Sequence, residues 1–411
     1  MEMTVNNHLV IGLMYGDEGK GRIVSALCHK YKEINGVVRF SGGPQAAHCV
    51  KSTDNYFEHI YASLGSGSHL GKTTYITRDV MVNPQALMTE LIVLNSKLPG
   101  DKYKTNELNI RISPDAKLIT PFDILRNKED IVNVHNGTTG MGVRKAIIRH
   151  ALIPLYVKDI FHPEVLRQKI DNYYANVGPW QEEGIMEYWD ETLDEYMQAA
   201  LDMRPYIDPT VKSLSVFNDS DNYNVVFESA QGLLLDPGMG FFPNVTASRV
   251  LPPRLMYTDD VWLVVRAYST RHGAGPMLLE NSISDPAFAE GINNPHEINK
   301  GGGFQGDLRL APFSHTLLKY SLSKFCDHYA NSGLIKRVNL VVTCMDCVQD
   351  LNDSIDPIKK EIFLTEIYNT FRGVMTDGSD VLNRHEPVDS DPYRLYYTKS
   401  PYQEDFPTRF K

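Results

Sequence analysis

The stretch that decides the fold is LVIGLMYGDEGKGRIV, residues Leu9–Val24. An apolar run at Leu9–Ile11 is followed by a glycine-rich turn, Gly16–Gly21, and apolar residues then recur at helical spacing. A strand, a glycine turn and a helix in this order place backbone N–H groups and a helix N-terminus against an anion, usually phosphate. The stretch therefore predicts an α/β fold that resembles the P-loop NTPases, with a phosphate site beside its first strand.

The turn departs from an ordinary P-loop in one respect. The pattern G-x-x-x-x-G-K-[ST] places a hydroxyl after the lysine, whereas Gly21 follows Lys20 here. Another oxygen must then replace the hydroxyl that normally holds Mg²⁺, and Asp17 lies inside the turn. A carboxylate beside a bound phosphate is repulsive unless a metal or a protonated partner intervenes, so Asp17 is the residue that needs an explanation.

Composition limits the classes of function. The chain has 411 residues, of which 42% are hydrophobic and 22% charged, as is typical of a globular protein with a large core. A net charge of −10 without a basic run disfavours nucleic acid as a partner. We find no membrane-spanning apolar run and no signal-peptide pattern, and five cysteines favour a reducing compartment. We therefore expect a cytoplasmic protein.

Polar loops follow several predicted strands. Because the carboxyl ends of parallel strands meet at one edge of a sheet, we expect these loops to converge there. Arg266, Arg271 and Arg309 lie in separate loops, and their guanidinium groups suit a carboxylate or a phosphate, which indicates an anionic substrate. The strands and their loops are Gly36–Phe40 with Ser41–His48, Val225–Phe227 with Glu228–Gly232, Val261–Val265 with Arg266–Pro276, and Leu340–Thr343 with Cys344–Cys347.

Strands that alternate with helices predict a mostly parallel central sheet flanked by helices. Residues 155–213 differ, because they are acidic, aromatic and helix-prone and lack a glycine loop. We interpret them as a helical insertion within one α/β domain, 1–411, whose aromatic residues mostly pack. The tail from His385 to Lys411 is polar and rich in proline and tyrosine, and contains no predicted strand.

Two further segments have open interpretations. Asn136–Gly142 contains two threonines and precedes Arg144, Lys145 and Arg149 on a predicted helix, which makes a plausible phosphate site. Asp346 could accept hydrogen bonds from guanine N1–H and its 2-amino group, or it could cap the next helix. The neighbouring CxxC at Cys344–Cys347 lacks a second ligand pair for zinc, so we interpret it as small buried residues.

The motifs, taken in order, resemble the adenylosuccinate synthetase family. The resemblance runs from Leu9 to Pro276 and resumes at Thr343–Asp346. It implies an enzyme that joins L-aspartate to C6 of a purine nucleoside monophosphate, using a nucleoside triphosphate and Mg²⁺, through phosphorylation of the 6-oxygen and displacement by the amine. The motifs are GDEGKG, GG-x-x-A-x-H, GTTG, E-x-AQG, T-x-S and AY-x-TR-x-GAGP.

The resemblance also implies roles for individual residues. Asp17 matches the catalytic base and Mg²⁺ ligand, together with the Ala47 carbonyl, and His48 matches the donor to the transferred phosphate. Lys20, the third residue predicted to be catalytic, would hold the triphosphate, and the phosphate donor is GTP or ATP. The remaining nucleotide-binding positions are Gly16, Glu18, Gly19, Gly21, Asp346, Lys399, Ser400 and Pro401. Substrate-binding positions are Gln45, Thr138, Thr139, Gln231, Thr246, Arg271, Gln305, Arg309 and, across a homodimer interface, Arg149.

The departures from the family pattern point to a branch. Where the family has the motif N-A-G-H, this chain has Gln45–His48, and where the family has T-K-L-D, it has Thr343–Asp346. Asn299–Arg309 stands in place of the family's arginine-rich aspartate-binding loop. With Pro44, this resembles the bacteriophage branch, which converts dGMP to 2-amino-2′-deoxyadenylosuccinate, a precursor of 2,6-diaminopurine DNA. A phage enzyme would work in the host cytoplasm.

Three functions follow as expectations. Asp17 argues for the alternative substrate IMP, because phage members often carry a small hydroxyl residue at that position. The sequence nevertheless favours a dGMP:aspartate ligase with GTP as the donor over an ordinary IMP:aspartate ligase. A non-catalytic nucleotide-binding relic is the third hypothesis.

Overall fold

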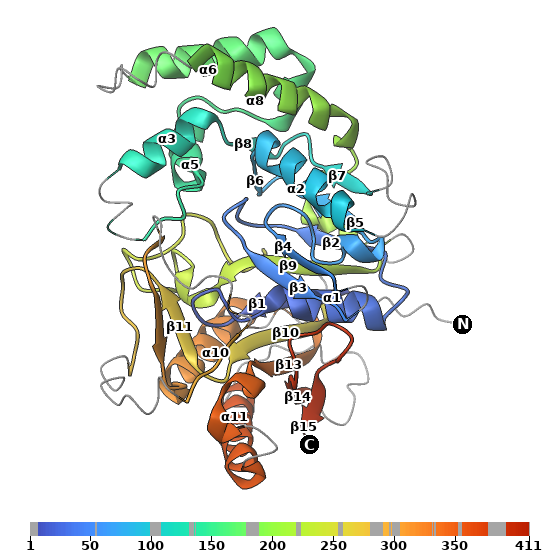
Figure 1. The fold of residues 1–411 in the computed structure, drawn as a ribbon, viewed down its shortest axis with the longest axis vertical. Coiled ribbons are helices and arrows are strands. Elements are labelled where there is room, and N and C mark those ends of the chain that lie inside the picture. The colour runs from blue at the N-terminus through green and yellow to red at the C-terminus, as the bar shows by residue number, and fades with distance from the viewer. Residues whose placement is uncertain are drawn as a thin grey trace.

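A nine-stranded sheet forms the centre of the molecule, in the order β15-β14-β13-β10-β1-β9-β2-β5-β7 (Figure 1). All pairings within it are parallel except β14–β15. The predicted mostly parallel sheet flanked by helices is therefore confirmed. The computed structural model describes residues 7–53, 56–98, 108–130, 135, 137–177, 189–218, 223–253, 258–279, 291–295, 297, 305–330, 332, 334–351, 356–376 and 392–410.

The elements follow the chain in a regular alternation. The central sheet comprises β1 (His8–Gly12), β2 (Gly36–Arg39), β5 (Thr73–Ile76), β7 (Ile110–Ile112), β9 (Val225–Gly232), β10 (Thr258–Arg266), β13 (Ile335–Thr343), β14 (Tyr393–Tyr397) and β15 (Thr408–Phe410). Three small sheets pair β3 (His48–Lys51) with β4 (Glu58–Tyr61), β6 (Met81–Val82) with β8 (Lys117–Leu118), and β11 (Ser269–His272) with β12 (Leu308–Ala311). The helices are α1 (Lys20–Lys30), α2 (Pro84–Lys97), α3 (Pro121–Glu129), α5 (Val143–His150), α6 (Pro163–Val177), α8 (Trp189–Met203), α10 (His315–Tyr329) and α11 (Pro357–Thr376).

Apolar side chains cover both faces of the sheet. Successive side chains of a strand point to opposite faces, so Val10 of β1 packs with Leu27 of α1, whereas Ile11 joins the cluster that contains Phe325 of α10 and Phe371 of α11. Burial on both faces is why the central strands are almost continuously apolar. The sheet is thus rigid where its strands end, and the loops there are held in place.

The α6–α8 pair lies at the opposite end of the molecule from α11 (Figure 1). Its residues Tyr173, Trp189 and Tyr196 are buried in one cluster with Leu87 and Leu91 of α2, so these aromatic side chains pack. Trp180 and Tyr188, two further aromatic residues of this segment, lie outside the described residues. That residues 155–213 are an insertion in a single domain stays a prediction.

The C-terminal tail is not wholly irregular, because it contains β14 and β15, which extend the sheet at one edge. In β14 the side chains of Tyr393, Leu395 and Tyr396 are buried, within a stretch whose prolines and polar residues are typical of a loop. Helix α2 begins at Pro84, because Asn83 caps it by accepting from the N–H of Ala86. No helix among the described residues is long and apolar enough to cross a membrane.

Candidate active site

The glycine-rich turn between β1 and α1 is braced by a buried carboxylate. Glu18 accepts hydrogen bonds from the N–H groups of Met14 and Gly16, each at 2.9 Å, and from Lys20 Nζ at 2.9 Å. A Cβ atom at Gly12 would lie 2.1 Å from the Glu18 carboxylate, so only glycine fits there. The Glu18 side chain thus points inward and fixes the turn, so the predicted nucleotide contact by Glu18 would have to come from its backbone N–H.

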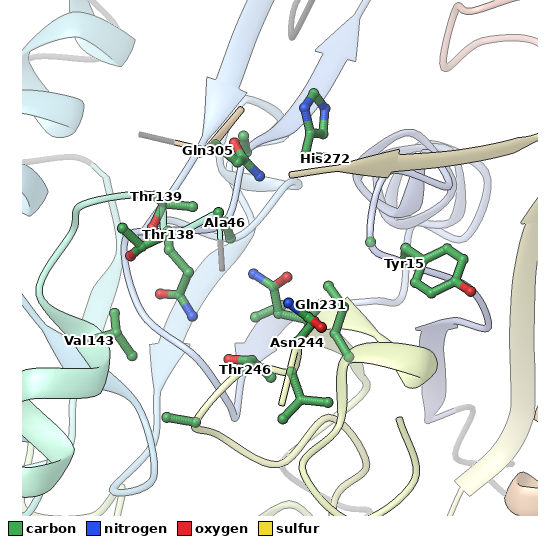
Figure 2. Close-up of a pocket in the computed structure, with 18 of the residues that line it drawn as sticks. Tyr15, Ala46, Thr138, Thr139, Val143, Gln231, Asn244, Thr246, His272 and Gln305 are labelled. Atoms are coloured by element: carbon green, nitrogen blue, oxygen red, sulfur yellow. The ribbon is translucent and has the colours of Figure 1, made fainter. Parts of the chain in front are cut away.

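Two cavities open at the carboxyl edge of the sheet. Figure 2 shows the first one, with Thr138 and Thr139 near Val143 on one side and Gln231, Asn244 and Thr246 grouped beside them. Of the predicted substrate-binding residues, this cavity gathers Gln45, Thr138, Thr139, Gln231, Thr246, Arg271 and Gln305. The second cavity gathers the predicted nucleotide-binding residues Gly16, Gly19, Lys20, Gly21, Asp346, Ser400 and Pro401.

The two cavities share a wall. Gly16, Asp17, Ala47 and His48 line both of them. A group transferred from a ligand in one cavity to a ligand in the other would therefore pass the Asp17 carboxylate and the His48 imidazole. Two of the three side chains predicted to be catalytic, Asp17 and His48, thus lie where such a transfer would take place, and the third, Lys20, lines the second cavity.

Asp17 is held by basic groups on β10 and β11. Its Oδ2 atom lies 3.0 Å from Nε2 of His272, and its backbone carbonyl accepts from Nε of Arg266. Burial by itself would raise the pKa of Asp17, but the His272 contact and the charges of Arg266 and Lys20 outweigh burial and lower that pKa. The carboxylate is therefore ionised at neutral pH, and with 28% of its side chain exposed it faces the cavities.

His48 is oriented by a buried glutamate at the sheet. Its Nδ1 lies 2.6 Å from Oε1 of Glu228, which also accepts from the Ser66 hydroxyl, and the Ser66 N–H donates to the second carboxylate oxygen. Burial lowers the pKa of His48, although Glu228 opposes that shift. Burial would raise the pKa of Glu228, but His48, Arg39 and Ser66 together lower it to about 2. Glu228 thus fixes the ring, and its other nitrogen, Nε2, lies 3.3 Å from the Ala230 carbonyl.

A cluster of hydroxyl and amide groups lies in the first cavity on residues that do not line the second. Asn127 Nδ2 donates to the Thr138 hydroxyl at 2.6 Å, and the N–H of Gly140 donates to the same oxygen. Arg144 lines this part of the cavity and donates from Nη2 to the Val245 carbonyl at 2.8 Å. The cluster therefore presents donors to an anionic group.

Arg149 does not reach the cavity, which corrects its predicted role across a subunit interface. Its side chain is fully buried, and its Nε and Nη2 both donate to the Asp123 carboxylate at 3.0–3.1 Å. Nη1 donates to the Ile153 carbonyl, and Nη2 also donates to that of Leu118. This guanidinium group ties α5 to α3 and has no surface to offer another subunit.

The two arginines expected to bind anionic substrate are tied to backbone carbonyls. Arg271 on β11 donates to the Pro276 and Asn244 carbonyls, and its guanidinium lies 4.4 Å from the centroid of the Tyr15 ring. Arg309 lies opposite Arg271 in the β11–β12 register and donates to the Gly275 carbonyl, but it does not line the first cavity. Most of the Asn299–Arg309 loop lies outside the described residues.

The second cavity lies at the end of β13. Thr343, the last residue of that strand, donates from its hydroxyl to the Glu18 carbonyl at 2.7 Å, which joins the strand to the glycine turn. Asp346 lines the cavity two residues after Cys344. Lys399 is exposed and lies over the Tyr397 ring, so it does not line the cavity as Ser400 and Pro401 do.

The shared wall fits a magnesium ion that binds together with phosphate. Mg²⁺ prefers oxygen ligands and usually takes one or two carboxylates, with substrate phosphates supplying others. The ionised Asp17 carboxylate faces both cavities, and Ala47 lies in the same wall. Among the residues that the structure describes, no three His, Cys, Asp or Glu side chains form a metal site by themselves, so bound phosphate would have to complete one.

Three residues of the site escaped the sequence prediction. His272 lies in the quoted AY-x-TR-x-GAGP motif, and a titratable group in a glycine-rich loop was a usable signal. Glu228 likewise begins the E-x-AQG motif, at a strand end. Asn127 had no motif of its own, because only the packing of α3 brings it to the cavity. Arg144 was named beside the Asn136–Gly142 loop as part of a plausible phosphate site, and it lines the first cavity.

Comparisons with known proteins agree on a family. The profile described as adenylosuccinate synthetase matches residues 9–300. The adenylosuccinate synthetase of Neisseria gonorrhoeae (strain FA 1090) is 32% identical over 328 residues, which cover 72% of this chain and 70% of that protein. That of Clostridium botulinum (strain Alaska E43) is 32% identical over 295 residues, covering 66% of this chain and 65% of its own length.

Two solved structures share the fold. Fully ligated adenylosuccinate synthetase from Plasmodium falciparum superposes with a TM-score of 0.69 at 16% identity, covering 99% of this chain and 100% of that one. The succinoaminodeoxyadenylate synthetase of cyanophage S-2L, bound to dGMP and to dATP as an energy donor, gives a TM-score of 0.61 at 14% identity, covering 98% and 95%. At these identities the likeness concerns the fold alone.

Proposed function

The chain belongs to the adenylosuccinate synthetase family and is a carbon–nitrogen ligase of that type, and from this premise we propose that it joins L-aspartate to C6 of IMP at the expense of a nucleoside triphosphate. The observation that carries the proposal is the wall of Gly16, Asp17, Ala47 and His48 between the two cavities. A purine monophosphate in the first cavity and a triphosphate in the second would meet there.

The first step is phosphoryl transfer to the 6-oxygen. The ionised Asp17 carboxylate takes the proton from N1, so that the 6-oxygen gains the electron density to attack the γ-phosphorus, and the nucleoside diphosphate leaves. The bond to the β–γ bridging oxygen breaks as the new O–P bond forms. His48, fixed by Glu228, donates a hydrogen bond to the transferring group, and the turn amides with Lys20 hold the triphosphate.

The second step is displacement at C6. The amine of L-aspartate attacks C6, and inorganic phosphate leaves with the former 6-oxygen. Phosphorylation is needed because phosphate is a far better leaving group than hydroxide or oxide. Mg²⁺, when bound beside Asp17 and Ala47, would offset the negative charge on the phosphates.

The choice of IMP rests on the relatives and on Asp17. Relatives at 32–33% identity are named adenylosuccinate synthetases, which favours IMP over dGMP, the substrate that the sequence alone favoured. Asp17 is the residue that the phage branch often replaces. Here it is retained and ionised, with His272 as its partner.

A second candidate substrate is dGMP, favoured by the altered aspartate loop. Of the arginines expected in that loop, this chain has Arg309, which donates to the Gly275 carbonyl and lies outside the first cavity. The cyanophage S-2L synthetase, which shares the fold, was solved with dGMP bound. A carboxylate can accept from both N1–H and the 2-amino group of guanine, so Asp17 is compatible with dGMP as well.

A parallel assay separates the candidates. The purified protein is given L-aspartate, Mg²⁺ and GTP, with IMP or dGMP, and the succinylated product is identified by mass spectrometry. We expect turnover of IMP. Turnover of dGMP alone would show that the substrate is dGMP and not IMP. If the protein binds nucleotide but releases no phosphate with either IMP or dGMP, the result would favour a non-catalytic nucleotide-binding relic. Asp17→Asn, which keeps the shape of the side chain, should lower turnover about 10³-fold, within the range of a lost general base.

We propose GTP as the donor, with ATP as the alternative, because Asp346 lines the second cavity. A carboxylate there would accept from guanine N1–H and the 2-amino group. Asp346→Asn should then raise the KM for GTP about 30-fold while ATP use changes little, as expected for loss of hydrogen bonds to a charged group. An unchanged KM for GTP would argue for ATP.

The homodimer and the insertion are also proposals. Light scattering at assay concentrations tests whether the chain forms a dimer. Limited proteolysis tests whether residues 155–213 are an insertion within one domain, since cleavage at their edges should leave the rest of the chain folded.

A further inference from the structure

We propose that Arg144 is the cation that binds the phosphate group of the purine monophosphate, and that it acts within its own subunit. This inference rests on the proposed function, because it assigns the phosphate end of that substrate. Arg144 is the second residue of α5 and lines the first cavity together with Thr138, Thr139 and Thr246.

The position of the phosphate follows from the two cavities. The 6-oxygen of the purine must lie at the shared wall, beside Asp17 and His48, if it is to be phosphorylated. The 5′-phosphate is at the other end of a nucleoside monophosphate, so it must lie among residues that line the first cavity and not the second. Arg144 and the threonines belong to that set.

The other basic side chains of the first cavity have different partners. Arg271 donates to two carbonyls and lies over Tyr15. His48 faces Glu228, and His272 faces Asp17 at the reaction end. Arg271 is thus tied by both Nη atoms, and the two imidazoles lie at the reaction end, which leaves Arg144 as the candidate at the phosphate end.

Arg144 is held in place by one hydrogen bond and keeps further N–H donors for a ligand. In the part of the chain that the structure describes, its guanidinium makes one hydrogen bond, from Nη2 to the carbonyl of Val245, the residue before Thr246. An arginine has five N–H donors in a planar fork that matches two phosphate oxygens. The Val245 contact therefore fixes the group beside the Thr246 hydroxyl and leaves donors for the ligand.

Acting within one subunit is a consequence of how α5 packs. Arg149, the residue expected to cross to a partner, is buried against Asp123. Arg144 comes from the same helix but lines the cavity of its own chain, beside Thr138 of the preceding loop. The charge is thus supplied in cis.

A binding comparison tests the assignment. Isothermal titration is done with the monophosphate that binds the unmodified protein, IMP or dGMP, and with the matching nucleoside, which lacks the phosphate. Arg144→Gln should weaken monophosphate binding about 30-fold and leave nucleoside binding within about twofold, and Arg144→Lys should recover part of the loss. Lys145→Gln, which removes a neighbouring charge on α5 that pairs with Asp130, is the matched control and should change neither.

The possible results distinguish a failure of the Arg144 assignment from a failure of the proposed function. Equal losses for monophosphate and nucleoside, or no loss for either, would overturn the assignment of Arg144 while leaving the proposed function intact. A wild-type protein that binds neither IMP nor dGMP would overturn the proposed function itself.

Mixing two impaired variants tests the cis arrangement, with the monophosphate kept near its wild-type Kd so that the weaker binding of Arg144→Gln limits turnover. If Arg144 serves its own subunit, dimers formed from Asp17→Asn and Arg144→Gln chains have a defect in every site and show no more turnover than the two variants assayed separately. If Arg144 served the partner, each mixed dimer would have one intact site, and recovered turnover would overturn the cis assignment. A monomeric active enzyme would support it directly.

Discussion

The Asp17 carboxylate oxygen Oδ2 lies 3.0 Å from Nε2 of His272, on the wall between two cavities. Only 4% of the His272 side chain is exposed, so the ring has little freedom to move away. The contact holds one carboxylate oxygen and leaves the second for a ligand. The carboxylate to which we assign the role of the base is thereby oriented from β11.

Removing the His272 imidazole should lower turnover more strongly than it weakens binding of the monophosphate. A hydrogen bond to a charged group contributes about 1.5–3 kcal/mol, so His272→Leu should lower kcat about 10–100-fold, with the Kd of the monophosphate within about threefold. His272→Gln keeps an N–H donor and should retain more activity than His272→Leu. Steady-state kinetics with separate titration of the monophosphate checks this, and a wild-type kcat for His272→Leu would refute it.

The His48–Glu228 contact predicts a specific acid sensitivity. The folded-state pKa of Glu228 is about 2, below its ordinary value of 4.5, so its contribution to stability is complete above pH 4.5 and is lost as the pH falls toward 2. The full shift corresponds to roughly 3 kcal/mol. Denaturant midpoints measured between pH 7 and pH 3 should fall less steeply for Glu228→Gln, although this variant is less stable at pH 7. Parallel curves for the two proteins would contradict the prediction.

Gly21 should not tolerate a side chain. A Cβ atom there would lie 2.7 Å from the Cβ of His48 and 3.2 Å from its backbone carbon, so Gly21→Ala must displace the start of β3. Overpacking of this kind costs about 1–3 kcal/mol. We expect a lower unfolding midpoint and a loss of turnover larger than the loss of nucleotide binding, because His48 moves. Gly373→Ala is the control, because a Cβ added at this residue of α11 would meet no atom from another described part of the chain within 4 Å. Since alanine is the better helix former, this variant should not lower the unfolding midpoint, and turnover should be unchanged.

Cys344 should be the reactive thiol of the nucleotide cavity. A hydrogen bond from Cys347 and the charge of Arg266 lower the pKa of Cys344 to about 7, whereas burial raises that of Cys49, in the same cavity, to about 11. Iodoacetamide should therefore label Cys344 first, with a rate that rises through pH 7 as the thiolate forms. Bound nucleotide should slow the labelling. Peptide mapping by mass spectrometry checks the site, and unchanged labelling of the Cys344→Ser variant would show that another cysteine reacts.

Local sequence was sufficient for the central strands and the glycine turn. The apolar run of β1 and the glycines of Gly16–Gly21 carry their signal within a few residues, because strand burial and backbone conformation are local properties. The tail was different, since β14 exists only because β13 provides hydrogen-bonding partners, residue by residue from Val338 to Val342. A strand at the edge of a sheet depends on its neighbour as much as on its own residues.

The sequence by itself determined the family, the α/β fold, the glycine-rich turn and the choice of Asp17 and His48 as candidates, because these depend on residue types at fixed spacing. Only the tertiary structure decided which basic side chains line the first cavity. Arg144 and Arg149 are five residues apart on α5, so they point about 140° apart around the helix axis. The packing of α5 against α3 directs Arg149 to Asp123 and leaves Arg144 at the cavity. Likewise, the pairing of β11 with β12 and the end of β1 bring His272 to Asp17 across 255 positions of sequence, which no local pattern encodes.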